Sequence, residues 1–441
     1  SERSISKRVD VLSLDEGAWA EGPEFPGAAF GVSAAVVDGR VVASGSDGHV
    51  YAWRPGDDEW THEATLTFPR FFHQMVATPA QDVYVLGGTS RGMRPIHVER
   101  IAISGGPSSY MQHWTVPSPA AAKNRQGMFI EDGWLYAFGG NTSTGQHDFG
   151  PDAFVADGYR LSLATLTWRE FDALPQARQS ISTAASPDGS HYLALGGFAH
   201  DGKVARTFGE AFMYNVRERE WAELGLVLPK PRSQFGLVEH GGSFWVFGGL
   251  DYDSRREEGD HFRHLFPVLR AEVSTATLSF EETGIDLPRT RRAFGGVEMN
   301  GTYYLIGGMT DNFQVVEQSD AFDFETQSFR TVASPARPRL SPQLVALGGK
   351  LYLAGGSSPR TTGRGMEPND SIEVYDPETD EWTTLMEGLP ISPRHMRMMP
   401  YRGRLLIFST HVDEHNVAHL ILIDPLAVPR DEAVAVRADA S

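Results

Sequence analysis

Seven arginines recur at similar places along the chain and could together bind an anion. They are Arg70, Arg125, Arg178, Arg232, Arg292, Arg339 and Arg394, each a few residues ahead of an apolar segment. A guanidinium offers a planar fork of N–H donors, which binds a carboxylate, sulfate or phosphate through two parallel hydrogen bonds. Two interpretations remain open. Some of these arginines contact an anionic ligand, or most are structural and bridge backbone carbonyls or acidic side chains of neighbouring units.

A second candidate site lies in the acidic segment 250–267. Glu257, Asp260 and His264 would offer two oxygen ligands and one nitrogen ligand to a divalent transition metal, iron or zinc, with open positions left for a substrate. The alternative is a solvated acidic loop that binds no metal. A weaker second set, which could equally be one face of a strand end, is His411, Asp413 and His415.

Three histidines are candidate acid–base groups, since a histidine can exchange a proton near neutral pH. His73 and His395 begin apolar segments, and His264 belongs to the acidic loop. The alternative is that they are ordinary hydrogen-bonded residues of the protein interior. The chain has no cysteine, which excludes disulfides, thiolate metal sites and cysteine nucleophiles.

The elements that would position these residues repeat along the sequence. Six short apolar segments end in a diglycine, at Gly87-Gly88, Gly139-Gly140, Gly196-Gly197, Gly248-Gly249, Gly307-Gly308 and Gly355-Gly356. They are spaced by 52, 57, 52, 59 and 48 residues. An aromatic residue follows in most units, as Trp382 follows Tyr375-Asp376-Pro377. A period near 50 residues with this content is typical of kelch repeats.

These strands, diglycines and tryptophans resemble the kelch family over essentially the whole chain. The resemblance implies an all-β, kelch-type β-propeller whose 2–3 and 4–1 loops surround the mouth of a central channel. The kelch family that the chain resembles includes galactose oxidase, sialate mutarotases, nitrile-specifier and thiocyanate-forming proteins, and protein-interaction adaptors. A copper-radical oxidase of the galactose oxidase type is excluded because its cofactor needs a cysteine. The acidic loop partly resembles the Glu-x3-Asp-x3-His iron triad of the specifier proteins, since Asp260 and His264 match but residue 256 is Arg and Glu257 is one place late.

Counting both the aromatics and the strand ends predicts eight four-stranded blades, with seven as the alternative. The last unit has no final Trp strand, whereas residues 9–19 resemble the end of a blade without its beginning. We therefore expect the N- and C-terminal segments to complete one blade together. Val9–Leu14 and Leu420–Ile423 compete for its third position. The propeller would be a single domain over residues 1–427, with 428–441 as a C-terminal extension.

Composition narrows the possible partners. The net charge of −18 disfavours binding to nucleic acid, whose phosphates would be repelled. No stretch has the length of an apolar membrane span, so we expect a soluble protein, and the compartment stays open. The predicted function is a small-molecule enzyme of lyase or isomerase type, holding an anionic substrate at the channel mouth, possibly with a metal. The alternative is a non-catalytic propeller that binds an acidic peptide, a protein or a small anion.

Overall fold

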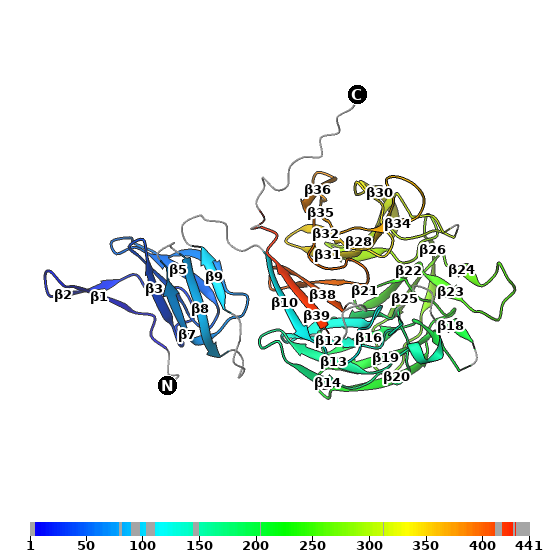
Figure 1. Ribbon diagram of the computed structural model, residues 1–441, viewed down its shortest axis with the longest axis horizontal. Coiled ribbons are helices and arrows are strands. Elements are labelled where there is room, and N and C mark those ends of the chain that lie inside the picture. Colours follow the sequence, from blue (N-terminus) through cyan, green and yellow to red (C-terminus); the bar gives the residue numbers. More distant parts are fainter. Residues whose placement is uncertain are drawn as a thin grey trace, which may run out of the picture. The chain divides into compact units, whose positions relative to one another are not determined.

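The chain forms two compact units, and the regular secondary structure of the described residues is β-strand apart from one short 3-10 helix (Figure 1). The computed structural model describes residues 5–78, 82–89, 98–102, 111–143, 150–202, 204–311, 313–410, 417–426 and 428. Unit 1 comprises Ser1–Tyr110 with Ser162–Thr167, and unit 2 comprises Met111–Leu161 with Trp168–Ser441. The strands confirm the all-β prediction. Within the described part of the chain, no helix has the length and apolar character needed to cross a membrane.

Unit 1 contains two sheets of the repeat type. The first consists, in order, of β3 (Ser33–Val37), β4 (Arg40–Ser44), β5 (His49–Trp53) and β6 (Thr61–Thr65). The second consists of β7 (Phe71–Ala77), β8 (Asp82–Thr89) and β9 (Glu99–Ala102). A separate hairpin is formed by β1 (Val9–Ser13) and β2 (Ala18–Gly22). The two larger sheets share one apolar core, in which Val42, Val50, Val83 and Val85 are completely buried.

The described residues of unit 2 form six four-stranded antiparallel sheets, which we call blades A to F. Blade A consists of β11 (Gly127–Glu131), β12 (Trp134–Phe138), β13 (Gly158–Ser162) and β14 (Trp168–Phe171), and blade B of β15 (Ser182–Ala185), β16 (His191–Leu195), β19 (Glu210–Asn215) and β20 (Glu220–Leu226). Blade C consists of β21 (Gly236–His240), β22 (Ser243–Phe247), β25 (Pro267–Glu272) and β26 (Glu281–Asp286), and blade D of β27 (Gly295–Met299), β28 (Thr302–Ile306), β29 (Ser319–Asp323) and β30 (Ser328–Val332).

The remaining elements of unit 2 complete the ring and decorate it. Blade E consists of β31 (Gln343–Leu347), β32 (Lys350–Ala354), β35 (Ile372–Asp376) and β36 (Glu381–Met386), and blade F of β37 (Arg397–Tyr401), β38 (Arg404–Thr410), β39 (Val417–Ile423) and β10 (Met111–Pro117). Small hairpins in the 2–3 loops are β17 (Phe198–His200) with β18 (Ala205–Thr207), β23 (Leu250–Tyr252) with β24 (Phe262–His264), and β33 (Ser357–Pro359) with β34 (Met366–Pro368). The loop of blade A carries the 3-10 helix η1 (Pro151–Ala153). The first strands of blades A to F contact one another in cyclic order, and β37 meets β11.

The ring of unit 2 closes in blade F by pairing an early strand with a late one. Strand β10 runs antiparallel to β39, from Met111 opposite Ile423 to Pro117 opposite Val417 (Figure 1). The prediction that residues 9–19 complete the closing blade is wrong. Strands β1 and β2 pair only with each other, and Trp19 lies in that hairpin. Residues 420–423 belong to β39 and fill the third position, so blade F needs only the fourth strand that β10 supplies.

The predicted single ring of eight blades is not confirmed. The described residues give six blades in the ring of unit 2 and two further repeat sheets in unit 1. Eight repeats are thus present in number, but one ring of eight or of seven blades is not confirmed. The C-terminal extension predicted for residues 428–441 lies outside the described residues except for Val428.

The recurring glycines and tryptophans join neighbouring blades. Gly307 in blade D has a φ of +68°, and a Cβ there would lie 2.3 Å from the carbonyl oxygen of Arg339 in blade E. Gly308 donates its N–H to the same carbonyl at 2.7 Å. Trp382 of blade E donates its indole N–H to the carbonyl of Ala333 in blade D at 2.9 Å. A side chain at the first glycine would therefore collide with the next blade, and the Trp fills the wedge between two blades.

Candidate ligand-binding site

Six residues just ahead of or at the start of the innermost strands surround one part of the central channel of unit 2. They are Arg125, Ser180, Gln234, Ala293, Ser341 and His395, one from each of blades A to F, and we call them the mouth ring. Each has a φ between +50° and +59°, a range that is uncommon for residues other than glycine.

Backbone hydrogen bonds between blades hold the mouth ring in this conformation. The N–H of Ser180 donates to the carbonyl of Arg125 at 2.8 Å, and the N–H of Ser341 donates to the carbonyl of Ala293 at 2.8 Å. Ala293 donates in the same way to Gln234 at 2.9 Å. Sparsely populated backbone conformations that the surrounding structure enforces are concentrated at functional sites. However, the same conformation recurs in unit 1, where Phe72 has a φ of +54° and its N–H donates to the carbonyl of Gly31 at 3.0 Å, so it is a feature of the repeat.

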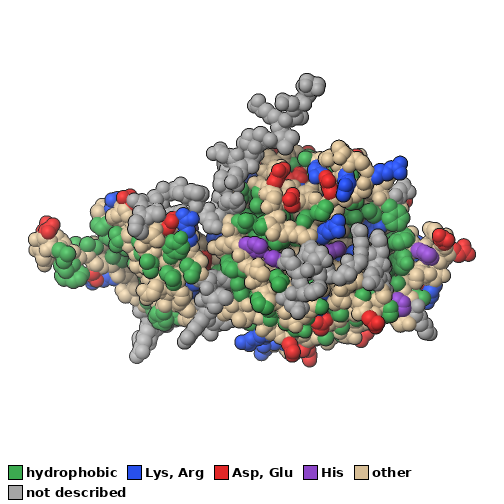
Figure 2. All heavy atoms as spheres, viewed as in Figure 1, with side chains coloured by type: hydrophobic (Ala, Val, Ile, Leu, Met, Phe, Trp, Pro, Cys, Tyr) green, Lys and Arg blue, Asp and Glu red, His purple; other side chains and the backbone are tan. Residues whose placement is uncertain are grey.

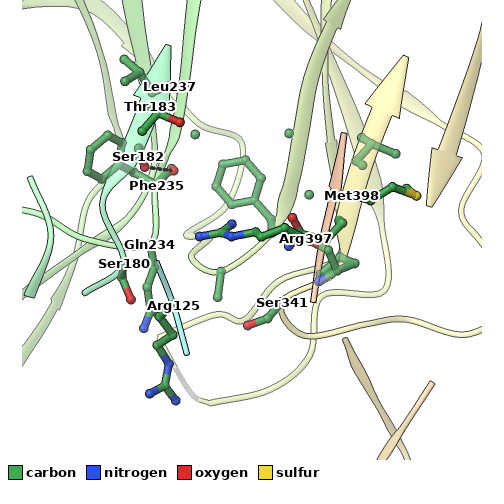
Figure 3. Close-up of a pocket in the computed structure, with 18 of the residues that line it drawn as sticks. Arg125, Ser180, Ser182, Thr183, Gln234, Phe235, Leu237, Ser341, Arg397 and Met398 are labelled. Atoms are coloured by element: carbon green, nitrogen blue, oxygen red, sulfur yellow. Dashed lines mark hydrogen bonds between the residues drawn. The ribbon is translucent and has the colours of Figure 1, made fainter. Parts of the chain in front are cut away.

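The channel that the mouth ring opens has a volume of about 330 Å³. Its walls are the first strands of all six blades, and the side chain of Arg397 points into it (Figure 3). Arg125 and His395 also line it, whereas none of the described lining residues is an Asp or a Glu. On the visible outer surface of unit 2, by contrast, acidic and basic side chains are interspersed (Figure 2). The channel is thus a cationic interior in a chain whose net charge is −18.

Arg125 and Arg397 are half-buried, and neither has a carboxylate partner among the described residues. Arg397 donates from Nη2 to the carbonyl of Gln126 at 2.7 Å, and Arg125 donates from Nη1 to Oδ1 of Asn124 at 3.2 Å. Loss of hydration on burial lowers the pKa of both guanidinium groups. Both remain cationic at neutral pH, because the pKa of arginine lies far above it. An anion in the channel would compensate these charges.

Tyr303 belongs to β28, the second strand of blade D, and lines the opposite side of the channel. A Cβ on Gly236 would lie 2.1 Å from its hydroxyl oxygen, and a Cβ on Gly296 would lie 2.0 Å from it. The two glycines therefore create the space that the hydroxyl occupies. Burial raises the pKa of the Tyr303 phenol, so that the group stays protonated and can donate a hydrogen bond to an anion.

Most of the recurring arginines have contacts of the structural kind. The guanidinium Nη1 of each donates to the carbonyl of the first glycine of its own diglycine, in the pairs Arg70–Gly87, Arg178–Gly196, Arg232–Gly248, Arg291–Gly307 and Arg339–Gly355. We call these five residues the anchor arginines. Three of them also form buried ion pairs, Arg70 with Glu99, Arg291 with Asp320 and Arg339 with Glu373. In these three, a carboxylate of the protein itself neutralises the charge of the guanidinium group.

The seven predicted arginines are therefore not equivalent. In blade D the anchor is Arg291, and its neighbour Arg292 instead donates from Nη1 to Oε1 of Gln234 in the mouth ring at 2.8 Å. In blade A the anchor position is taken by Lys123, which pairs with Asp157, and Arg125 lies two residues later in the mouth ring. Arg394 is exposed and does not line the channel.

The residues predicted to bind a metal do not converge. His264 accepts a hydrogen bond at Nε2 from Nε of Arg292 at 3.1 Å, and burial together with Arg292 lowers its pKa to about 4. Asp260 pairs with Arg263, the neighbour of His264 in β24, whose side chain points to the other face of the hairpin. Glu257 is exposed near the tip of the loop. Among the described residues, no group of three His, Asp or Glu side chains is arranged to hold a metal.

The three candidate acid–base histidines lie in different surroundings. His73 belongs to β7 of unit 1, where burial and Arg70 lower its pKa. His264 contacts Arg292 as described. Of the three, His395 alone lines the channel. The alternative metal set His411, Asp413 and His415 lies outside the described residues.

Two channel residues, Arg397 and Tyr303, were missed by the sequence prediction. Arg397 stands inside an apolar strand segment two residues after the mouth-ring position, where four of the other blades carry glycine or serine. A long cationic residue at a position mostly occupied by small residues was the available signal. Tyr303 carried no local signal, because its partners Gly236 and Gly296 belong to other strands.

Comparison with known proteins gives the same fold. The Kelch motif model matches residues 338–388. The chain is 28% identical over 248 residues to alpha-scruin of Limulus polyphemus, covering 54% of this chain but 25% of that protein. It is 24% identical over 346 residues to the Kelch-like protein terF of Aspergillus terreus, covering 74% of this chain and 70% of that protein. The chain thus spans about a quarter of the length of alpha-scruin.

A solved structure resembles a large part of the chain. The structure of YjhT superposes with a TM-score of 0.55 and 16% sequence identity, and the match covers 68% of this chain and 94% of that one. At this identity the likeness concerns the fold. Together with the diglycine repeat, the four-stranded sheets and the motif match, it shows that the chain has a kelch-type β-propeller fold.

Proposed function

We propose that the propeller of unit 2 binds a small organic anion in its central channel, with Arg397 and Arg125 as the charged contacts. The observation that carries this proposal is the presence of two half-buried arginines, without carboxylate partners among the described residues, in a channel whose described lining has no acidic side chain. A charge that is partly removed from water and lacks a counter-charge is costly to a fold. A bound anion is the simplest compensation.

The size of the channel favours a small molecule over an acidic peptide. Its volume of about 330 Å³ lies at the lower end of the range found for small-molecule sites. The anion would contact Arg397 through a charge-assisted hydrogen bond. The hydroxyl of Tyr303 would donate a further hydrogen bond from the opposite wall, where the glycines leave room.

A catalytic role is the second candidate, because two groups that can transfer or donate a proton line the same channel. They are His395 and Tyr303. An isomerase or lyase acting on a carboxylic acid needs such groups beside the bound anion. A metal is not part of this proposal, since the residues predicted to bind one do not come together in the described structure.

Binding is tested with a panel of mono-, di- and tricarboxylic acids and sugar acids, each paired with its neutral amide. Thermal-shift screening identifies acids that stabilise the protein, and calorimetry gives their affinities. We expect at least one acid to bind while its amide does not. Arg397→Gln should weaken binding about 10- to 100-fold, from the loss of a charge-assisted hydrogen bond.

Arg394→Gln is the matched control, because this exposed arginine belongs to the same blade but does not line the channel. Its affinity should equal that of the wild type. The proposal is refuted if no acid on the panel binds, or if Arg397→Gln and Arg394→Gln bind equally well. Turnover of each bound acid is then followed by NMR, and loss of turnover without loss of binding in His395→Gln or Tyr303→Phe would establish the catalytic alternative.

A further inference from the structure

Two histidines face each other on the strands that close the ring of unit 2. His113 lies in β10 opposite Ile421, and His419 lies in β39 opposite Thr115. The two positions are diagonal neighbours on one face of blade F. Nε2 of His113 and Nδ1 of His419 form a hydrogen bond of 3.0 Å, and the ring centroids are 5.2 Å apart. His113 is exposed and His419 is half-buried, so that solvent reaches the pair.

The separation of the two nitrogens suits a chelated metal ion. Imidazole nitrogens bind transition metals at about 2.0–2.1 Å, so two of them at a right angle lie roughly 2.9 Å apart and two at a tetrahedral angle roughly 3.4 Å apart. The observed 3.0 Å is close to the right-angled value. Right-angled nitrogen ligands are typical of the tetragonal geometry of Cu²⁺ and Ni²⁺, and Cu²⁺ has the highest affinity among the first-row divalent ions.

We propose that His113 and His419 form a surface site for a divalent transition metal, best suited to Cu²⁺, that joins the closing strand β10 to β39. The metal would replace the contact between the two rings. Each ring would be neutral, with its remaining proton on the nitrogen that faces away from the metal, and water would fill the other coordination positions. The site is separate from the channel and does not depend on the function proposed for it.

A metal at this place would stabilise the ring at its point of closure. The metal binds both strands only when β10 is paired with β39, so binding favours the closed blade by linkage. The pair His49 and His62 in unit 1 provides an internal comparison. There the ring centroids are 5.4 Å apart, but the ring nitrogens contact the hydroxyl of Thr65, at 3.1 and 3.2 Å. Close rings alone therefore do not give this nitrogen-to-nitrogen geometry.

The test uses the full chain, freed of metal with a chelator and then dialysed. Cu²⁺ alone is titrated by calorimetry, and its coordination is read from the nitrogen hyperfine pattern in electron paramagnetic resonance. We expect one site with two imidazole nitrogens and an increase in the melting temperature on binding. His113→Gln and His419→Gln should each weaken binding about 100-fold, because a chelate becomes a single-ligand site, and should abolish the thermal shift.

His240→Gln is the control, since this histidine of unit 2 stacks on Phe324. It should bind Cu²⁺ as the wild type does. Equal affinity of the wild type and His113→Gln would overturn the proposal, as would a spectrum that shows a single nitrogen ligand. The melting temperatures of the metal-free variants are measured in parallel, and a variant that does not fold is replaced by His113→Asn or His419→Asn.

Discussion

Replacing the anchor arginine of blade E should destabilise unit 2 strongly. Arg339 is completely buried and donates to the carbonyls of Gly355 and Ser371, at 3.3 and 3.0 Å, and to the hydroxyl of Ser371 at 2.9 Å. It also forms an ion pair with the buried Glu373. Arg339→Met would leave that carboxylate without its counter-charge, a change that typically costs about 3–5 kcal/mol.

For a unit of roughly 300 residues, this loss corresponds to a melting temperature lower by about 5–8 °C. Chemical denaturation gives the free energy of unfolding, and calorimetry gives the melting temperature. Glu373→Gln in the Arg339→Met background should recover a large part of the loss, because the neutral amide oxygen can still accept the hydrogen bond that the N–H of Ala336 donates at 3.1 Å. A cost below about 1 kcal/mol for Arg339→Met, or no recovery in the double variant, would refute the structural role assigned to the anchor arginines.

Two further predictions test the contacts between blades and the pH dependence of the fold. Trp382→Phe should lower the free energy of unfolding by about 1 kcal/mol in chemical denaturation, because it removes the hydrogen bond to the carbonyl of Ala333. An unchanged denaturation midpoint would contradict the role of Trp382 in joining blades D and E. Burial and Arg292 lower the pKa of His264 from 6.5 to about 4, so the folded state binds fewer protons than the unfolded chain between these values. The contribution of His264 is therefore present above pH 6.5 and is lost as the pH falls toward 4. His264→Gln should show a shallower loss of stability between pH 7 and pH 5 than the wild type, and equal slopes would exclude this assignment.

The repeat could be predicted from the sequence because each of its signals has a local physical cause. A diglycine is needed wherever a backbone carbonyl of the next blade approaches, as at Gly307, and a Trp where two blades diverge, as at Trp382. How the repeats divide between unit 1 and unit 2 could not be predicted in this way. A blade in either unit needs the same local pattern, and the strand that contains Trp114 has the same pattern whether it ends the sheet of β7 or closes blade F.

The candidate site was predicted only in its general character. A cationic channel mouth was expected, but the one-residue shift between Arg291 and Arg292 decides which of them is a buried anchor and which contacts the mouth ring. Spacing along the sequence does not determine which of two adjacent residues takes the buried position. Arg397 and Tyr303 enter the channel from strands, and only Arg397 carried a signal in the sequence, as a long cationic residue where most other blades have a small one.

The closure of the ring by β10 has a consequence for biosynthesis. The strand is made first among the elements of unit 2, and its partner β39 is about 300 residues away. At a translation rate of roughly 5–20 residues per second, β10 waits about 15–60 s before it can pair. During this interval its backbone groups and Trp114 are open to other chains, as in any unpaired edge strand. Co-translational chaperone capture should therefore concentrate on residues 111–117, and the last slow step of folding should be the docking of this strand.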